Sequence, residues 1–383
     1  MDFATPGIFD RASTIKFQDF IQFPVAAHLI AQARASELYD DQVLAHGIRA
    51  IVGRETTVYL QYFYGPQVAL PFVELSGLSF IAEAAIWVTL SLLMYFACIY
   101  LLWKACPGLR EYPALVLLCA IAYPPLFHFF VRGQLSAAVL VCFTGASLAF
   151  LAGRDLLAGI ALGILVFKPQ FLVAVPVVLL LAHAWRMIAG LVISAGAQLA
   201  FTLLYFGPAV MRQYLRMLLH SASHPRTTEL ALSPIQMHSL GTFWELLIPW
   251  PRGVWILYAL SSLAVIGVAA AVWKSSSPRA LRFSALILAS VLVNPHLYIY
   301  DLLALCPVFL LVADWALNHV QHPLTPALHV CLYLAFMLPL FGPLSRWTHI
   351  QLSVPVFAAL LWMLWRHSKT PSHKLDSGDS AVV

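Results

Sequence analysis

Charged residues are scarce in this chain of 383 residues. Only 10% are Asp, Glu, Lys or Arg and 61% are hydrophobic, whereas soluble domains carry about 25% charged residues. The six cysteines form no CxxC pair, which argues against a disulfide framework or a cysteine-bound metal. The P-loop, GxGxxG, GxSxG and HExxH motifs are also missing. These absences leave soluble nucleotide-driven chemistry unsupported, and the composition indicates a polytopic membrane protein.

Long apolar runs predict an all-α bundle of about eleven transmembrane helices in a single integral-membrane domain. A helix needs about 20 apolar residues to cross a hydrocarbon layer about 30 Å thick. The runs do not alternate apolar and polar residues as the strands of a β-barrel would. The predicted spans are residues 79–103, 112–130, 134–152, 155–167, 169–184, 187–206, 253–273, 279–293, 297–313, 325–342 and 348–366.

Two polar breaks interrupt the apolar sequence. Lys168-Pro169 divides residues 156–185, and Asn294-Pro295-His296 divides residues 280–317. Proline removes a backbone donor and bends or ends a helix. If each divided segment is a hairpin, the basic connections all fall on the cytoplasmic side together with the tail, residues 367–383, as the positive-inside rule requires.

This arrangement gathers the polar segments on the outer side of the membrane. They are the front segment (residues 17–78), the corner Arg132-Gly133-Gln134, the two breaks, and a long loop over residues 207–252. We therefore expect a functional site at the outer face. Because the basic residues are explained by membrane topology, they give no reason to expect a nucleic-acid partner.

The front segment is the most polar part of the chain. Residues 1–18 contain no apolar run long enough for a signal peptide or a helix. Residues 20–30 and 42–51 mix apolar and polar side chains, which predicts amphipathic helices at the membrane surface. A long acidic segment ahead of the first span favours a role in function.

Two charged residues stand out by their surroundings. Asp19 has phenylalanine neighbours, and a carboxylate at an apolar boundary suits a general base; the alternative is a solvated acid or a helix cap. Lys168 follows an apolar run, and a lysine at membrane depth is a functional candidate. A phosphate is its natural partner, and the alternative is a lysine that reaches the interface.

Three other polar residues are further candidates. Arg132, beside Gln134, has a planar fork that favours bidentate phosphate or carboxylate binding, or else it caps a tight turn. His296 lies at a helix break on the same side as these residues, although a lone histidine is usually structural. Asp40 has the sequence context of a turn or a helix start.

The order of several short motifs resembles glycosyltransferase family 87, once described as a domain of unknown function, DUF2029. This family belongs to the integral-membrane GT-C glycosyltransferases and is similar to polyprenyl-phosphate-mannose-dependent mannosyltransferases. The similarity covers about residues 17–315. The motifs that carry it are Gln18-Asp19-Phe20, Leu38-Tyr39-Asp40, Tyr64-Gly65-Pro66, Pro71, Gly133-Gln134, Ala158-Gly159, Lys168-Pro169 and Asn294-Pro295-His296.

The resemblance implies a GT-C-like fold and an inverting hexosyltransferase at the outer face of the plasma membrane, the inner membrane of a bacterium. Asp19 takes the position of the catalytic base, and the family has a leading membrane helix before it, which residues 1–18 do not supply. The donor would be a polyprenyl-phosphate sugar, with mannose expected, and the acceptor a glycolipid or glycan. No cofactor or metal is expected. The predicted substrate-binding residues are Lys168, Arg132, Gln134, His296, Asn294, Tyr64 and Asp40.

A transporter or flippase for a lipid-linked or other amphipathic solute is the alternative function. Broken helices with charges at membrane depth are also typical of transporters. Many transporters show internal repeats and short outer loops, however, and this sequence has no detectable repeat and two long polar segments, residues 17–78 and 207–252. The sequence therefore favours the enzyme.

Overall fold

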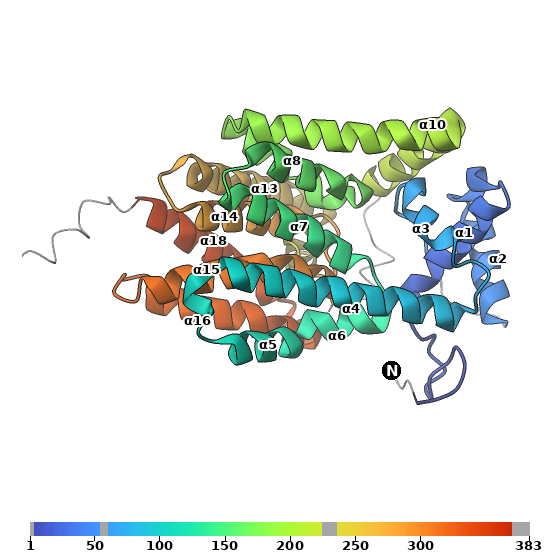
Figure 1. Cartoon of the computed structure of the whole chain (residues 1–383), viewed down its shortest axis with the longest axis horizontal. Helices are drawn as coiled ribbons and strands as arrows, with labels where there is room; N and C mark the ends of the chain where they lie inside the picture. Colours follow the sequence, from blue (N-terminus) through green and yellow to red (C-terminus); the bar gives the residue numbers. More distant parts are fainter. Residues whose placement is uncertain (1–3, 54–59, 224–235, 370–383) are drawn as a thin grey trace, which may run out of the picture.

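The computed structural model describes residues 4–53, 60–223 and 236–369. These residues form helices joined by turns, with two isolated bridges and no strand among them. The predicted all-α class is therefore confirmed. Figure 1 shows the helices of the bundle running roughly along one axis, with the front segment at one end.

Five helical segments within the described residues are long and apolar enough to cross a membrane, and a sixth results if two helices bent by 51° form one span. The predicted count of about eleven is not confirmed. The five are α4 (Phe80–Ala105), Trp185–Leu219 of α10, α13 (Pro251–Lys274), Ile299–Asn318 and Thr325–Thr348, and the bent pair is α5 (Pro113–Ala122) with α6 (Pro124–Arg132).

The other predicted spans coincide with shorter helices. These are α7 (Ser136–Leu151), α8 (Asp155–Gly163) with η5 (Ile164–Phe167), η6 (Pro169–Leu172) with α9 (Val175–Leu181), α14 (Arg279–Val293) and α18 (Ser353–Lys369).

Both predicted breaks explain why some helices are short. Lys168 leaves the helical region, with φ −132° and ψ 71°. α14 ends at Val293, and Asn294 is its C-cap. Lys168 and Asn294 each precede a proline, which disfavours the α conformation. After the second break the chain continues as η8 (Ile299–Leu305) and α15 (Cys306–Asn318).

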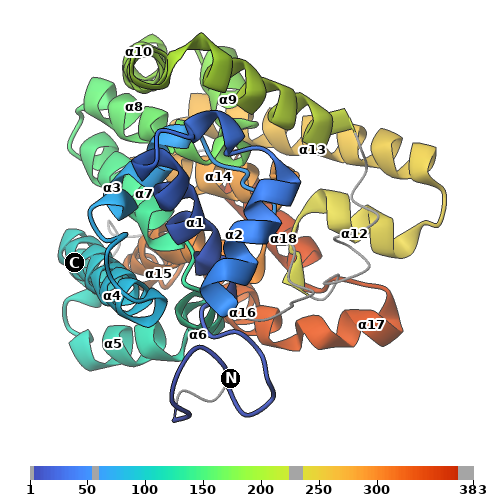
Figure 2. The same cartoon turned by 90° about the vertical axis from the view of Figure 1, so that its right-hand side faces the viewer.

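The front segment folds into a small helical unit that packs on the N-terminal end of α4. Its elements are η1 (Gln18–Ile21), α1 (Gln22–Ala31), η2 (Ala35–Glu37), α2 (Asp41–Val52), η3 (Pro66–Ala69) and α3 (Leu70–Val73). α2 buries one face, as predicted for an amphipathic helix. α1 differs from that prediction: it is buried on nearly every side, because it packs against both α2 and α3. Figure 2 shows this unit in front of the bundle.

α14 is the central helix of the bundle. It contacts α7, α9, α13, α15 and α18, and every residue from Phe283 to Val293 is buried. A helix that is apolar on all sides belongs in an interior. Its C-terminal end carries the Asn294-Pro295-His296 break, so this break lies at the end of the most enclosed helix.

Residues 207–252, predicted as a loop, are helical over much of their length. α10 (Trp185–Ser223) passes through Gly207, whose φ of 81° bends it, and α12 covers Leu240–Leu247. Beyond the bend, α10 turns toward the front segment (Figure 1), where Tyr214 packs on Tyr39 with ring centroids 5.8 Å apart. Residues 224–235 of this predicted loop, and 370–383 of the predicted tail, lie outside the described residues.

Helices α8 and α10 approach closely through glycines. Gly159 and Gly163 are one turn apart on α8, and Gly190 of α10 lies against Gly159. A Cβ at Gly159 would lie 2.0 Å from the carbonyl oxygen of Met187. This glycine spacing allows two membrane helices to pack backbone against backbone.

The substitution Gly159→Ala is expected to destabilise the protein by about 1–3 kcal/mol, because a methyl group there meets rigid backbone. Gly196→Ala on α10 is the matched control, because nothing lies within 4 Å of its Cβ position. This control should be neutral or slightly stabilising. Thermal unfolding of the purified proteins in detergent measures both effects, and equal midpoints for the two variants would contradict this account of the crossing.

Candidate active site

A tight corner between α6 and α7 positions the polar residues of the site. Gly133 ends α6 with φ 69°, a left-handed conformation that favours glycine. A Cβ on Gly133 would lie 2.9 Å from Cβ of Phe20, so the corner packs directly against the front segment. The indole of Trp87 on α4 donates to the Gly133 carbonyl at 3.1 Å. The corner therefore joins the front segment to the bundle.

Asp19 is bound by the residues on either side of this glycine. Arg132 Nη1 lies 3.1 Å from Asp19 Oδ1, and Gln134 Nε2 donates to Oδ2 at 3.1 Å. The other end of the Gln134 amide accepts a hydrogen bond from the Tyr64 hydroxyl at 2.9 Å. Four residues named from the sequence thus meet in one buried network.

The backbone at Asp19 is fixed by aromatic packing. The ring of Phe20 lies 5.5 Å from Phe72 of α3, 5.9 Å from Phe23 of α1 and 6.1 Å from Phe80 of α4, measured between centroids. The amide of Gln22 also donates to the Asp19 carbonyl at 2.8 Å. Asp19 is therefore held by three helices as well as by the corner.

A second ion pair lies deeper in the bundle. Lys168 Nζ pairs with Asp301 Oδ1, and the hydroxyl of Ser136 donates to the same oxygen at 2.7 Å. The side chains of Lys168 and Asp301 are 3% and 1% exposed. Lys168 Nζ also lies 5.7 and 5.6 Å from the ring centroids of Phe171 and Tyr300. Its position at the break is as predicted, but its neighbour is an internal carboxylate.

Asp301 is the site residue that sequence reasoning missed. It is a single acid inside an apolar stretch, and a charge at such a place is normally paired. That rule would have selected it as the partner of Lys168, since the two breaks were expected on the same side.

The two ion pairs form one connected site. Ser136, which binds Asp301, is two residues from Gln134, which binds Asp19. Burial raises the pKa of the Tyr64 hydroxyl well above its usual value, and Asp301 and Asp19 both raise it further. The same two carboxylates lie within electrostatic reach of Tyr300. Tyr64 and Tyr300 thus lie near both carboxylates, and both tyrosines are buried.

His296 and Asn294 lie beside this site at the second break. The imidazole of His296 contacts Phe63 at a tilt and Tyr298 edge to face, with ring centroids 5.9 and 5.1 Å apart. Tyr298 in turn stacks on Tyr300 at 5.3 Å, so a row of aromatic rings leads from half-buried His296 to the ring beside Lys168. The side chain of Asn294 accepts from the His296 backbone N–H at 2.8 Å.

Asp40 has a local role in the structure. It is exposed, and its Oδ1 accepts from the backbone N–H groups of Gln42 and Val43 at 2.9 and 3.2 Å. These contacts make Asp40 the N-cap of α2, as its sequence context of a helix start indicated. Its neighbour Tyr39 is closer to the site, because the Tyr39 hydroxyl donates to the Tyr64 carbonyl at 2.9 Å.

No group of three His, Cys, Asp or Glu side chains among the described residues is placed to hold a metal ion. The positive charges beside the two carboxylates are Arg132 and Lys168. The arrangement can therefore accept a proton at Asp19 and offer N–H donors to an anion.

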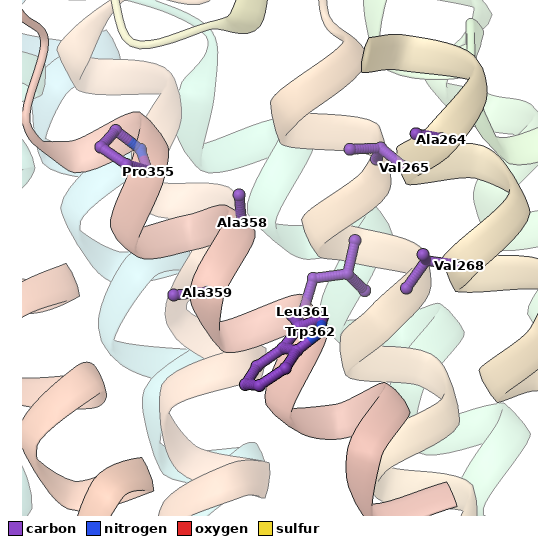
Figure 3. Close-up of a pocket in the computed structure, with 8 residues that line it drawn as sticks. All are labelled: Ala264, Val265, Val268, Pro355, Ala358, Ala359, Leu361 and Trp362. Atoms are coloured by element: carbon purple, nitrogen blue, oxygen red, sulfur yellow. The ribbon is translucent and has the colours of Figure 1, made fainter. Parts of the chain in front are cut away.

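A separate groove lies on the bundle between α13 and α18, with a volume of about 470 Å³ (Figure 3). It contains no titratable side chain. Its lining is Ala264, Val265, Val268, Pro355, Ala358, Ala359, Leu361 and Trp362. Such a lining suits hydrocarbon and offers no group for catalysis.

The long apolar helices and the enclosed ionic site define the class of protein: an integral-membrane protein with a buried polar centre. The family model of glycosyltransferase family 87 matches residues 62–295, more than half of the chain. The chain belongs to this family, as its motifs indicated, and is therefore a membrane glycosyltransferase. None of the curated proteins and none of the solved structures matches it.

The matched region contains most of the site but neither of its two carboxylates. Tyr64, Arg132, Gln134, Lys168 and Asn294 fall within residues 62–295. Asp19 precedes the match and Asp301 follows it, so their assignment to the site rests on the contacts described above.

Breaking the deeper ion pair is expected to be costly. Lys168→Met leaves Asp301 buried without its counter-ion, which should destabilise the protein by about 3–5 kcal/mol. The double variant Lys168→Met/Asp301→Asn should recover part of this loss, because neither charge then remains. Thermal unfolding in detergent, compared across the double-mutant cycle, measures the coupling.

The exposed pair Arg34–Glu37 provides the control for this cycle, with side chains 47% and 36% exposed. Glu37→Gln should leave the unfolding midpoint unchanged, because exposed pairs contribute little. Additive effects of the Lys168 and Asp301 substitutions would show that Lys168 and Asp301 are not energetically coupled.

Proposed function

We propose that this glycosyltransferase transfers a hexose from a polyprenyl-phosphate donor to a lipid or glycan acceptor at the outer face of the plasma membrane. Mannose is the sugar that the family resemblance favours. The observation that carries the proposal is the placement of Asp19, an acid from the front segment held by Arg132 and Gln134 at the end of a membrane bundle.

The proposed reaction is a single inverting displacement with Asp19 as the general base. The carboxylate takes the proton of an acceptor hydroxyl while the hydroxyl oxygen forms a bond to C1 of the hexose. The bond between C1 and the phosphate oxygen breaks, and polyprenyl phosphate leaves with its electron pair. Positioning, base catalysis and charge stabilisation supply the rate enhancement, and no cofactor is required.

Arg132 is proposed as the main ligand of the donor phosphate. Its side chain is 25% exposed, and Arg offers five N–H donors, more than its contacts with Asp19 and Gln236 use. Lys168 is enclosed behind it and paired with Asp301. We assign Lys168 a supporting role, in which it adds positive charge behind the phosphate. Tyr64 and Gln134 would orient the base.

The charge pattern supports the outer side of the membrane, if residues 156–185 and 280–317 are hairpins as the sequence predicts. In this proposal the tail is in the cytoplasm and the front segment and both breaks are outside, where a lipid-linked sugar and an external acceptor can meet. The apolar surface of the bundle suits the polyprenyl chain. The transporter alternative places the same charges on a translocation path, and the following experiment distinguishes the two.

The variant Asp19→Asn is expected to lower sugar transfer by about 10²- to 10⁴-fold, because the amide cannot accept the proton. Purified protein would be incubated with radiolabelled polyprenyl-phosphate mannose or glucose and a cell-lipid extract. The labelled product is then quantified.

Asp155→Asn is the matched control for this assay. Asp155 forms a partly exposed ion pair with Arg279 at the start of α8, and its loss should leave transfer unchanged. Equal transfer by Asp19→Asn and wild type would remove Asp19 as the base. Movement of labelled lipid across vesicles without any transfer would support the transporter instead.

A further inference from the structure

The short segment Gln236-Met237-His238 connects three parts of the site. Gln236 Oε1 lies 3.4 Å from Arg132 Nη2. Met237 forms an isolated antiparallel bridge with Tyr298, and the His238 N–H donates to the Leu297 carbonyl at 2.9 Å. On its other side, Gln351 Nε2 donates to the Met237 carbonyl at 2.8 Å. The segment therefore fixes the second break against Arg132.

His238 is fully buried, and one of its ring nitrogens is unpaired. Nδ1 lies 2.7 Å from the hydroxyl oxygen of Ser353. Nε2 has no hydrogen-bond partner among the described residues. Burial, together with the smaller effect of His128, lowers the pKa of this imidazole to about 3. The ring is therefore neutral, and its second nitrogen offers one hydrogen bond inside the protein.

Asn294 provides a second buried group of this kind. Its Oδ1 accepts from the His296 N–H, which fixes the orientation of the amide and makes Nδ2 the donor end. Nδ2 is buried and has no partner within the described part of the chain. Buried polar atoms are normally paired. The His238 N–H binds the carbonyl of Leu297, which is three residues after Asn294. Two unpaired atoms on segments joined in this way point to a ligand.

A hydroxyl group matches both atoms. Neutral imidazole is a donor at one nitrogen and an acceptor at the other. Nε2 therefore accepts if Nδ1 donates to the Ser353 hydroxyl, and donates if Nδ1 accepts from it. A hydroxyl both donates and accepts, and it can pair with either tautomer. Its oxygen can also accept from Asn294 Nδ2. A phosphate or carboxylate would match only one of the two tautomers.

The location of these two atoms favours the sugar of the donor as their ligand. In a polyprenyl-phosphate hexose the sugar is attached directly to the phosphate, for which Arg132 is the proposed ligand. Gln236 contacts Arg132, and His238 is two residues further on, which is at most roughly 7 Å along the chain. That span is of the order of one hexose ring.

We propose that His238 Nε2 and Asn294 Nδ2 form a subsite that binds a hydroxyl group of the donor hexose and so selects the sugar. This inference rests on the proposed function, because it takes the donor to be a polyprenyl-phosphate hexose. His238 and Asn294 bind the sugar here and take no part in proton transfer.

The test measures binding of polyprenyl-phosphate mannose and of its singly deoxygenated forms to the full chain in detergent, by isothermal titration calorimetry. Wild type is expected to bind one deoxygenated form about tenfold more weakly or worse, because the two protein groups then stay unpaired. In His238→Phe this form and the parent should bind equally. Asn294→Asp, which keeps the acceptor for His296 but loses the donor, should also reduce the difference.

Gln351→Leu is the matched control, because it removes an anchor of the segment without touching either subsite atom. It should weaken all donors by the same factor and keep their ratio. A uniform loss in both His238→Phe and Asn294→Asp would overturn the subsite, as would wild type that binds every form equally or binds none. Transfer measured in parallel tests the proposed function separately: binding with selection but without transfer would overturn the transferase proposal and leave the subsite standing.

Discussion

The structure depends on one constraint: charges placed among apolar helices must be paired within the protein. A single charge at membrane depth is expensive, and a buried ion pair is tolerated only where further hydrogen bonds complete it. The corner between α6 and α7 meets this need twice. Arg132 and Gln134 bind Asp19. Ser136, the first residue of α7, binds Asp301 beside Lys168. The five consecutive residues 132–136 therefore contain ligands for both carboxylates.

Because one of these carboxylates comes from the front segment, the site exists only when this segment packs on the bundle. The contact is specific: Gly133 has no side chain where Phe20 lies, and Phe20 in turn packs among rings from α1, α3 and α4. Packing and electrostatics are therefore coupled. Moving Phe20 away from the corner would also separate Asp19 from Arg132.

The sequence was sufficient to predict the all-α class, both helix breaks and four residues of the Asp19 network, because polar residues in apolar sequence are conspicuous. It did not predict the pairing. Lys168 was expected to bind a phosphate, and its internal partner Asp301 was overlooked. Hydropathy indicates depth in the membrane but not which side chains contact one another there. The number of spans was also not confirmed, because hydropathy runs do not show that prolines and bends leave several helices too short to cross. α1 was expected at the surface because residues 20–30 mix apolar and polar side chains, yet packing against α2 and α3 buries most of it.

The difference in exposure between the two ion pairs separates their roles. The Arg132 side chain is 25% exposed and that of Asp19 11%, whereas Lys168 and Asp301 are almost completely enclosed. Of the two ion pairs, the first is therefore the more accessible to a substrate. This difference supports the proposal that Asp19 and Arg132 carry the chemistry. The deeper pair fixes the relative position of the two helix breaks, and so holds the end of α14, with Asn294, against the corner from which Asp19 is bound.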